Sequence, residues 1–337
     1  MQDFVNKLWY PKADTHIGFK GLKWLLSPLS LLFWIISSIR RLLFKLRLKA
    51  VVSMSVPVII VGNITVGGSG KTPTVIYLIE LLRRQGFNPG IVSRGYGVEF
   101  DGVKRVELGM GAELVGDEPA MIVARTQVSM VIGRDRVKAA QALIEAYDVD
   151  IIISDDGLQH YRLARDIELL ILDGERRFGN GLLLPSGPLR ELTDRQKHVD
   201  FTIVNGEAQK GEFQMTLKPT QFIPVSPLSQ QVFNLSTPVV AIAGIGNPER
   251  FFTTLRQSGV QVMKTKAFED HQKFSLEAIT KVTQCGPVLM TEKDAVKCRD
   301  FAKDNWWYLA VDAKLAANFD QLLMEQIRQV IAVKQGN

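Results

Sequence analysis

The chain has 337 residues, 46% of them hydrophobic and 23% charged, which is the composition of a globular protein long enough for two domains of ordinary size. Its net charge of +6 is concentrated at one end, because residues 1–50 hold nine Lys or Arg against two Asp, while the other 287 residues hold 32 basic and 33 acidic side chains. A basic end on a neutral body favours a surface that this end contacts. We expect that surface to be a membrane, and we expect no nucleic-acid partner.

The basic end also carries the longest apolar run. Residues 24–39 contain no charge, Pro28 interrupts the run near its start, and five basic residues crowd into 40–49. The run is shorter than the roughly 20 apolar residues that a membrane span needs. On a helix, a narrow polar stripe would be formed by Ser30, Ser37, Arg41, Lys45 and Lys49. We therefore expect residues 1–50 to form a helix that lies in the membrane interface with its basic residues on anionic headgroups. A buried core helix and a single membrane span are the open alternatives.

A glycine-rich turn follows the first strand pattern, in PVIIVGNITVGGSGKTPTVIYLIELL at residues 57–82. Strand, glycine loop ending in Lys-Thr, and helix is the order of a phosphate-binding P-loop, whose backbone N–H groups point at phosphate oxygens. Lys71 can reach the β- and γ-phosphates, and the Thr72 hydroxyl can ligate Mg²⁺. The general pattern has glycine where this chain has Thr65. The loop predicts a nucleotide site made by Thr65, Val66, Gly67, Gly68, Ser69, Gly70, Lys71 and Thr72.

Strand and helix patterns alternate for more than a hundred residues after this loop. We expect strands at 57–62, 90–94, 128–132, 150–154, 167–172 and 200–205, and helices near 73–85, 117–125, 134–147 and 191–198. Several strands are continuous apolar runs, which is typical of a parallel sheet covered on both faces. Residues 51–206 are thus expected to form an α/β core of the P-loop NTPase type.

Two adjacent acids, Asp155 and Asp156, end one of these apolar strands. Alone, such a pair is more often a solvated turn. An acid at the end of a buried strand that follows a P-loop is, however, the usual second ligand of the nucleotide's Mg²⁺. Ligands of open α/β sheets collect at the carboxyl ends of the strands, which would bring both acids near Thr72. We therefore expect a metal site made by Thr72, Asp155 and Asp156.

Three further motifs lie where strands end or helices begin. Arg94 belongs to SRGYG, which suits a polar loop at the ligand face or an ordinary turn. Asp117 of GDEP is either a helix N-cap or a carboxylate aimed into the site. Arg190 and Glu191 end a long loop, residues 179–192, and long ordered loops in compact domains are often functional.

The composition changes in the second half of the chain. Residues 207–236 are polar and proline-containing, and we interpret them as a linker with a short β-ribbon near Phe213–Leu217. Residues 237–337 resume the α/β rhythm and are expected to form a second, smaller α/β domain. In this part Glu292 occupies the position where many GTPases that read guanine have lysine, which argues mildly against GTP.

Seven motifs, taken in order, resemble those of the tetraacyldisaccharide 4′-kinases, the lipid A 4′-kinases of Gram-negative bacteria: VGNITVGGSGKTP, SRGYG, GDEP, SDDGLQH, LLPSGPLRE, EDHQKF and TEKDAVK. The resemblance implies two α/β domains joined by a β-ribbon, with a monotopic N-terminal helix at the cytoplasmic face of the inner membrane. The implied reaction, a step in lipid A and lipopolysaccharide biosynthesis, transfers the γ-phosphate of ATP to the 4′-hydroxyl of a tetraacyl glucosamine disaccharide 1-phosphate, with Mg²⁺.

The resemblance also implies roles for single residues. Asp117 would be the general base, paired with His271, and Lys71 would act on the transferred phosphate. Arg190, Glu191 and His160 would lie near the acceptor or the reacting phosphates, and Arg94 of the strand-end loop is our further candidate for binding the substrate. Asp117 and His271 are 154 residues apart on different expected domains, so we hypothesise that domain closure over ATP assembles the pair. The competing hypothesis is a membrane-tethered P-loop ATPase or GTPase that acts as a switch or targeting factor on a protein partner.

Overall fold

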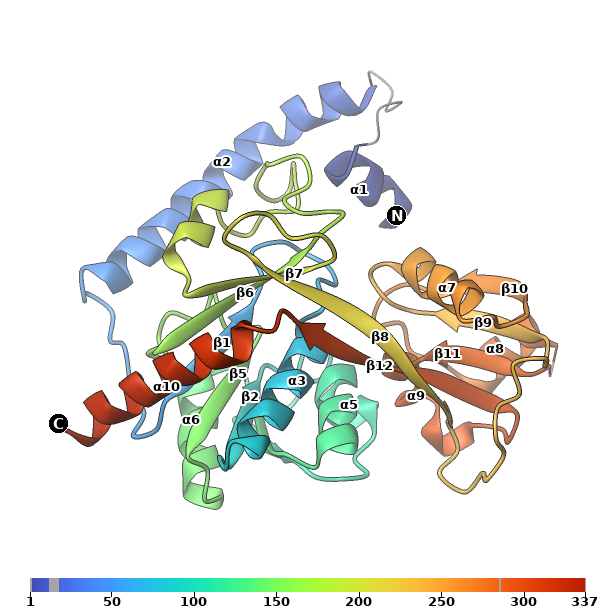
Figure 1. Ribbon diagram of the computed structural model, residues 1–337. Helices are drawn as coiled ribbons and strands as arrows, with labels where there is room; N and C mark the ends of the chain where they lie inside the picture. Colours follow the sequence, from blue (N-terminus) through green and yellow to red (C-terminus); the bar gives the residue numbers. More distant parts are fainter. Residues whose placement is uncertain (1, 12–17, 285, 337) are drawn as a thin grey trace.

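In the computed structural model, which describes residues 2–11, 18–284 and 286–336, one twelve-stranded sheet runs through the whole molecule (Figure 1). The strand order is β10-β9-β11-β12-β8-β7-β6-β1-β5-β2-β4-β3. The strands are β1 Val58–Gly62, β2 Pro89–Ser93, β3 Val103–Val106, β4 Ser129–Gly133, β5 Ile151–Asp155, β6 Ile167–Asp173, β7 Phe201–Asn205, β8 Phe213–Pro224, β9 Val239–Ala243, β10 Val262–Ala267, β11 Val288–Thr291 and β12 Trp306–Leu315.

Helices cover both faces of this sheet. They are α1 Gln2–Trp9, α2 Gly18–Lys45, α3 Lys71–Arg84, α4 Ala112–Val115, α5 Asp117–Thr126, α6 Arg136–Ala146, α7 Pro248–Gln257, α8 Leu276–Thr283, α9 Glu292–Ala295 and α10 Phe319–Gln335, with 3₁₀ turns η1 Thr193–His198 and η2 Arg299–Phe301. β3 and α4 were not predicted, and residues 193–198 form a 3₁₀ turn where we expected an α-helix.

The first half confirms the expected P-loop type of α/β core. β1 lies between β5 and β6, parallel to both, and Ile59 is in register with Ile153 and Ile167. Every residue of β1, β5 and β6 is buried, because these continuous apolar runs meet helices on each face. α3, α5 and α10 contribute to the core on one face, and α6 contributes to the core on the other.

A long strand joins the two halves of the molecule. β8 is parallel to β7 at its beginning, where Ile203 is in register with Phe213, and antiparallel to β12 from Met215 to Pro224. The segment expected as a linker with a short ribbon therefore contains a twelve-residue strand that makes the sheet continuous, and Figure 1 shows β8 and β12 crossing together from one half to the other.

The expected linker at 207–236 and second domain at 237–337 remain a prediction. These boundaries imply that the last helix packs on the second half, but it does not. α10 lies on the first half, where the Phe319 ring is 5.5 Å from Phe201 and 5.4 Å from Phe213. Near its end, Lys334 Nζ is 3.2 Å from Asp166 Oδ2. The chain thus returns to the first half after completing the second.

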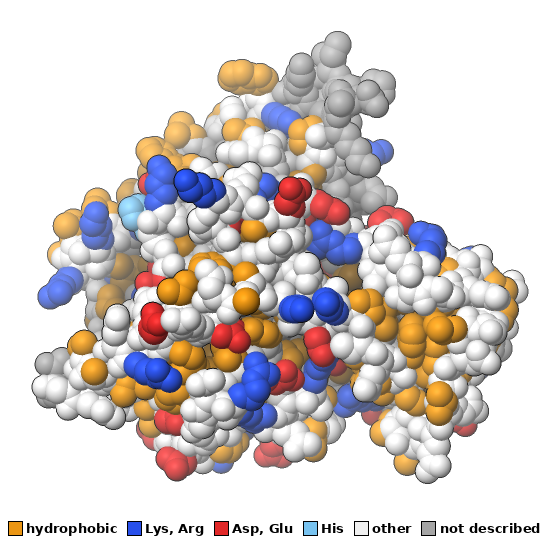
Figure 2. All heavy atoms as spheres, in the orientation of Figure 1, with side chains coloured by type: hydrophobic (Ala, Val, Ile, Leu, Met, Phe, Trp, Pro, Cys, Tyr) orange, Lys and Arg blue, Asp and Glu red, His pale blue; other side chains and the backbone are white. Residues whose placement is uncertain are grey.

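The N-terminal segment forms two helices rather than the single helix we expected. α2 is continuous through Pro28 and lies along the surface, with hydropathy and length sufficient for a membrane span. Its spacing places Leu25, Leu29, Leu32, Ile36 and Ile39 on one face, and each is more than half exposed. Figure 2 shows hydrophobic side chains at the surface along α2.

The polar stripe of α2 faces partly inward, which corrects the expectation that it meets lipid headgroups. Ser30 Oγ donates to Leu183 O at 2.9 Å and accepts from Ser186 N at 3.1 Å. Arg41 Nη1 lies 3.5 Å from the buried Glu191 Oε2. Ser30 and Arg41 therefore attach α2 to the loop at 183–191 and leave the apolar face outside.

Candidate active site

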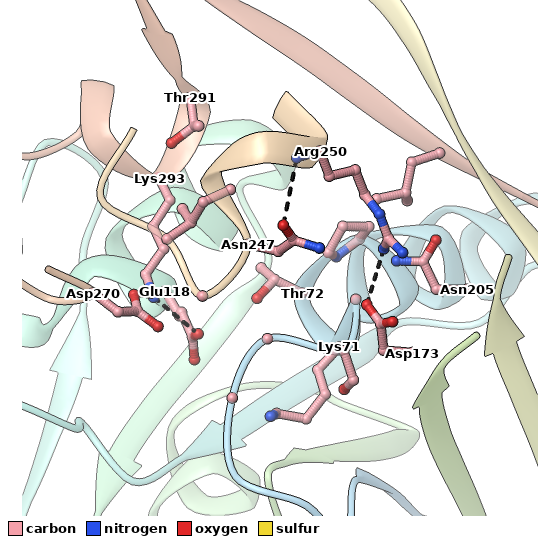
Figure 3. Close-up of a pocket in the computed structure, with 18 of the residues that line it drawn as sticks. Lys71, Thr72, Glu118, Asp173, Asn205, Asn247, Arg250, Asp270, Thr291 and Lys293 are labelled. Carbon is pink, nitrogen blue, oxygen red and sulfur yellow. Dashed lines mark hydrogen bonds and ion pairs between the residues drawn. The ribbon is translucent and has the colours of Figure 1, made fainter. Parts of the chain in front are cut away.

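A cavity of about 1450 Å³ lies between the two halves, at the carboxyl ends of β1, β5, β6 and β7. The first half lines it with the P-loop and several carboxylates, and the second half closes it with loops that follow β9, β10 and β11. Figure 3 shows side chains of both halves pointing into this space. Ligands of open α/β sheets bind at the carboxyl ends of the strands, so this is the expected position for a ligand site.

The P-loop has the backbone that its glycines allow. Gly67 and Gly70 have φ of 111° and 101°, values that a residue with Cβ rarely adopts. The loop is held from outside, because Val66 N donates to Pro188 O at 2.9 Å and Arg190 N donates to Ile64 O at 2.7 Å. Thr65, the departure from the general pattern, forms a β-bridge with Leu189. The threonine thus extends the loop's pairing with the segment at 183–190.

The two strand-end acids differ in environment. Asp155 is 1% exposed, accepts from Ser93 Oγ at 3.2 Å, and its Oδ1 has no hydrogen-bond partner among the described residues. Burial, with the charges of Glu118 and Asp156, raises the pKa of Asp155 to about 7. An oxygen that is buried and unpaired in this way suits a bound cation.

Asp156 is already neutralised by cations. Lys71 Nζ lies 3.5 Å from one of its oxygens and Arg190 Nη1 lies 3.1 Å from the other. Burial opposes ionisation of Asp156, but the charges of Lys71 and Arg190 outweigh it and hold its pKa below the ordinary value. Asp156 therefore fixes the P-loop lysine and an arginine at the same point of the cavity.

The structure brings the predicted base and its partner together. His271 Nδ1 lies 3.2 Å from Asp117 Oδ2, although the two residues come from different halves. The Tyr96 ring lies against the imidazole, with centroids 4.9 Å apart. Asp117 begins α5, and the preceding Gly116 fits because a Cβ there would be 2.9 Å from Tyr96 O.

Two lysines of the TEKDAVK motif complete this cluster. Lys297 Nζ is 3.3 Å from Asp117 Oδ2 and 3.1 Å from the buried Asp294. Lys293 Nζ is 3.3 Å from His271 Nε2 and 2.9 Å from the Asp270 carboxylate. Figure 3 shows Lys293 beside Asp270. Burial opposes ionisation of Asp117, but the His271 hydrogen bond and the charges of both lysines lower its pKa. Asp117 is therefore held as a carboxylate.

A second polar group lies at the opposite end of the cavity, beyond Lys71 and Thr72. Asp173 ends β6 and Asn205 ends β7, and Arg250 reaches across from α7 to place Nη1 3.0 Å from Asp173 Oδ2 (Figure 3). We did not predict these residues. The available signal was a polar residue followed by glycine at the end of each strand, in Asp173-Gly174 and Asn205-Gly206.

The predicted substrate residues divide into two groups. Arg94 and Arg190 line the cavity, whereas His160 and Glu191 are not among the described residues that line it. Glu191 is 3% exposed and accepts from Tyr161 Oη at 2.6 Å and Gln159 Nε2 at 2.8 Å. Burial and the charge of Arg136 lower the pKa of His160 to about 4, so its imidazole is neutral near pH 7. Its Nε2 is buried without a partner among the described residues.

Three comparisons relate this chain to known proteins. The sequence model of the tetraacyldisaccharide-1-P 4′-kinase family matches residues 22–328. A tetraacyldisaccharide 4′-kinase of Shewanella woodyi is 80% identical over 337 residues, 100% of this chain and 99% of its own, and that of Shewanella loihica is 61% identical over 344 residues, 100% of both. LpxK from Aquifex aeolicus, solved in complex with ATP, is similar in structure with a TM-score of 0.77 at 28% identity, covering 92% of this chain and 99% of that one.

Proposed function

The chain belongs to the tetraacyldisaccharide-1-P 4′-kinase family, and we propose that the central cavity carries out its reaction with the residues assigned below. The enzyme is a kinase that transfers the γ-phosphate of ATP to the 4′-hydroxyl of a tetraacyl disaccharide 1-phosphate in lipid A biosynthesis. One observation supports the location most strongly: Lys71 of the P-loop and the Asp117–His271 pair line the same cavity.

ATP is expected to lie along the cavity with its phosphates on residues 65–72. The backbone N–H groups of that loop and the start of α3 supply the partners that phosphate oxygens need. The base would then extend toward the carboxyl ends of β6 and β7, where Asn205 and Arg250 lie. The γ-phosphate would extend the other way, toward Asp155, Asp156 and Asp117.

The residues present fit a magnesium ion. The Thr72 hydroxyl and the unpaired, buried Asp155 Oδ1 are oxygen donors of the kind that Mg²⁺ takes, together with phosphates of the nucleotide. When bound, the ion supplies neutralisation of charge on the β- and γ-phosphates. Asp156 is less suited as a direct ligand, since Lys71 and Arg190 already occupy its oxygens.

Asp117 is the proposed general base. A sugar hydroxyl is a weak nucleophile, and a carboxylate that accepts its proton as the new P–O bond forms lowers the barrier. His271 and Lys297 both approach Oδ2, so Oδ1 is the oxygen that can take the proton. His271 then orients the carboxylate, and the pair forms only when the second half lies over the first.

Lys71, Arg94 and Arg190 are the proposed cationic contacts of the transferred phosphate and the acceptor. Phosphoryl transfer depends mainly on alignment and on stabilising charge on the phosphate oxygens. Arg190 is aimed into the cavity by Asp156 and by its place after the loop at 183–189. His160 and Glu191 are not among the described residues that line the cavity, so we propose that they act indirectly, by holding Arg190 and its surroundings in place near the acceptor.

The enzyme is proposed to work at the cytoplasmic face of the inner membrane as a monotopic protein. α2 presents exposed apolar residues along one face, and Val5, Asn6 and Trp9 of α1 contribute to the cavity wall. A helix of this kind buries its apolar face in the lipid and keeps the active site at headgroup level. The acceptor's sugars lie at that level, so the substrate need not leave the membrane.

The decisive experiment follows the phosphate. The full-length protein in mixed detergent micelles receives ATP labelled at the γ-phosphate and the tetraacyl disaccharide 1-phosphate, and the label is expected at the 4′ position. A matched acceptor without a 4′-hydroxyl should stay unlabelled. Label that appears only as inorganic phosphate would instead support the membrane-tethered switch, which the family membership does not favour.

A further inference from the structure

The residue that follows α1 reaches the nucleotide loop. α1 is fixed by Trp9 Nε1, which donates to Pro185 O at 3.0 Å, and by Asn180 N, which donates to Trp9 O at 2.8 Å. The next residue, Tyr10, lies in the cavity wall and its hydroxyl is 3.4 Å from Val66 O. Trp9 and Tyr10 themselves precede residues 22–328, where the family's sequence model matches.

Arg176 lies on the face of this tyrosine. Its guanidinium carbon is 5.2 Å from the centre of the Tyr10 ring, the geometry of a cation–π contact. Its backbone N–H donates to Asp173 Oδ1 at 2.9 Å, which fixes the turn after β6. The guanidinium also lies over the P-loop, because a Cβ built on Gly67 would be 3.9 Å from Nη1.

The same guanidinium reaches the other half of the molecule. Arg176 Nη2 donates to Gly246 O at 2.9 Å. Gly246 itself meets the P-loop, since a Cβ built there would lie 2.9 Å from Gly68 N. The P-loop, the turn after β6 and the loop after β9 therefore meet around one arginine.

We propose that Tyr10 is a positioning residue for the closed nucleotide site, because its ring holds the Arg176 guanidinium between the P-loop and Gly246. The long side chain of Arg176 loses rotamer freedom when it bridges the two halves, and this loss of entropy opposes the bridge. The ring removes most of that freedom before ATP arrives. The N-terminal segment, which carries α1 and α2, thereby stabilises the closed arrangement around the triphosphate. This inference rests on the proposed function of the cavity as an ATP site.

The test measures ATP affinity by equilibrium binding to the full-length protein in detergent, without lipid acceptor. Tyr10→Leu removes the π face, and we expect the Kd for ATP to rise about tenfold, in the range of a partly desolvated cation–π contact. Tyr10→Phe keeps the ring and is expected to recover most of the lost affinity. Arg177→Gln is the matched control, because the neighbouring arginine pairs with Glu212 and is not among the described residues that line the cavity.

A double variant separates positioning from simple loss of structure. If Tyr10 acts through Arg176, Tyr10→Leu combined with Arg176→Gln should bind ATP no more weakly than Arg176→Gln alone. Fully additive losses, or unchanged affinity in Tyr10→Leu, would overturn the inference. Tyr10→Met fills the same space without a π face and serves if the leucine variant does not fold. With acceptor present, KM for ATP should rise while KM for lipid stays unchanged.

The two proposals fail in different ways. A wild-type protein that binds ATP but labels no lipid would defeat the proposed function and leave the role of Tyr10 standing. A wild-type lipid kinase whose ATP affinity does not depend on the ring of Tyr10 would defeat this inference alone.

Discussion

Lys297 Nζ lies 3.3 Å from Asp117 Oδ2, across the boundary between the two halves. The side chain of Lys297 is 5% exposed, packs over the Phe274 ring at 5.0 Å and bonds Asp294 on its other side. Its charge is thus fixed beside the proposed base. A cation beside a carboxylate favours the ionised form, so the pKa of the carboxyl group is lower than in water.

The first prediction concerns the pH dependence of kcat. The base works when deprotonated, so kcat falls as pH falls through the pKa of Asp117, which Lys297 helps to lower. Lys297→Met removes that charge, so the pKa of Asp117 should rise and the acid limb of the kcat–pH profile should move to higher pH. Lys281→Gln, an exposed lysine of α8, is the control.

Loss of stability alone would not produce that shift. Lys297→Met also leaves Asp294 without its lysine, so a lower melting temperature is expected as well. A variant with lower stability and an unmoved acid limb would show that Lys297 is structural only.

The second prediction separates the members of the dyad. Asp117→Asn should lower kcat about 10²- to 10⁴-fold, the usual contribution of a positioned base, with little change in KM for ATP. His271→Ala should cost less, about tenfold, because Lys297 still holds Oδ2. The measurement is steady-state kinetics with saturating lipid. A larger loss for His271 than for Asp117 would assign the proton transfer to the imidazole instead.

The third prediction distinguishes the two strand-end acids through their need for Mg²⁺. Asp155→Asn should raise the Mg²⁺ concentration for half-maximal activity at least about tenfold, since the buried, unpaired oxygen is the proposed ligand. Asp156→Asn should mainly lower kcat, because it releases Lys71 and Arg190 from their shared partner. Titration of Mg²⁺ at fixed ATP checks both, and equal Mg²⁺ requirements would contradict the assignment.

Short motifs made much of the site predictable. The P-loop, Asp155 and Asp156 follow from strand-end chemistry, and the structure places them together as expected. Asp173 and Arg250 were not predicted, because their contact depends on how β8 and β12 fold the second half onto the first. Glycine spacing alone does not show that Gly246 would meet Gly68. Such contacts are set by tertiary packing rather than by local sequence.

The helix α2 shows the same limit in another form. Periodicity correctly groups Ser30 with Arg41 on one stripe, yet it does not say what the stripe faces. We assigned the stripe to lipid headgroups, and the structure turns these two residues toward the loop at 183–191. The loop's own polar groups, Leu183 O and the Glu191 carboxylate, attract them. Sequence periodicity shows which residues share one face of a helix, but the tertiary contacts of that face decide whether it turns toward the protein or toward the membrane.

The fourth prediction tests closure with one methyl group. Gly246→Ala would place Cβ 2.9 Å from Gly68 N, a backbone atom that has little room to move. The two loops must then separate by a few tenths of an ångström, and kcat/KM for ATP should fall about tenfold. Gly21→Ala, where a Cβ meets nothing within 4 Å, is the control. Unchanged kinetics would mean that the loops need not touch during turnover.

The fifth prediction uses the inward direction of the α2 stripe to test membrane binding. Deleting residues 1–45 would also uncover the loop at 183–191, so a lost activity would have two causes. Replacing Leu32 and Ile36 with Asp changes only the exposed face, since both side chains are more than half exposed. Partition into vesicles containing anionic lipid should fall strongly, because two charges cannot enter the acyl region without large cost. KM for lipid in mixed micelles should rise while ATP affinity is kept.

The matched pair Ser30→Ala and Arg41→Gln should instead leave partition into vesicles unchanged and lower the stability of the protein, because those side chains bond the loop at 183–191. Equal vesicle binding by the Asp variant and the wild type would remove the exposed face of α2 as the membrane contact.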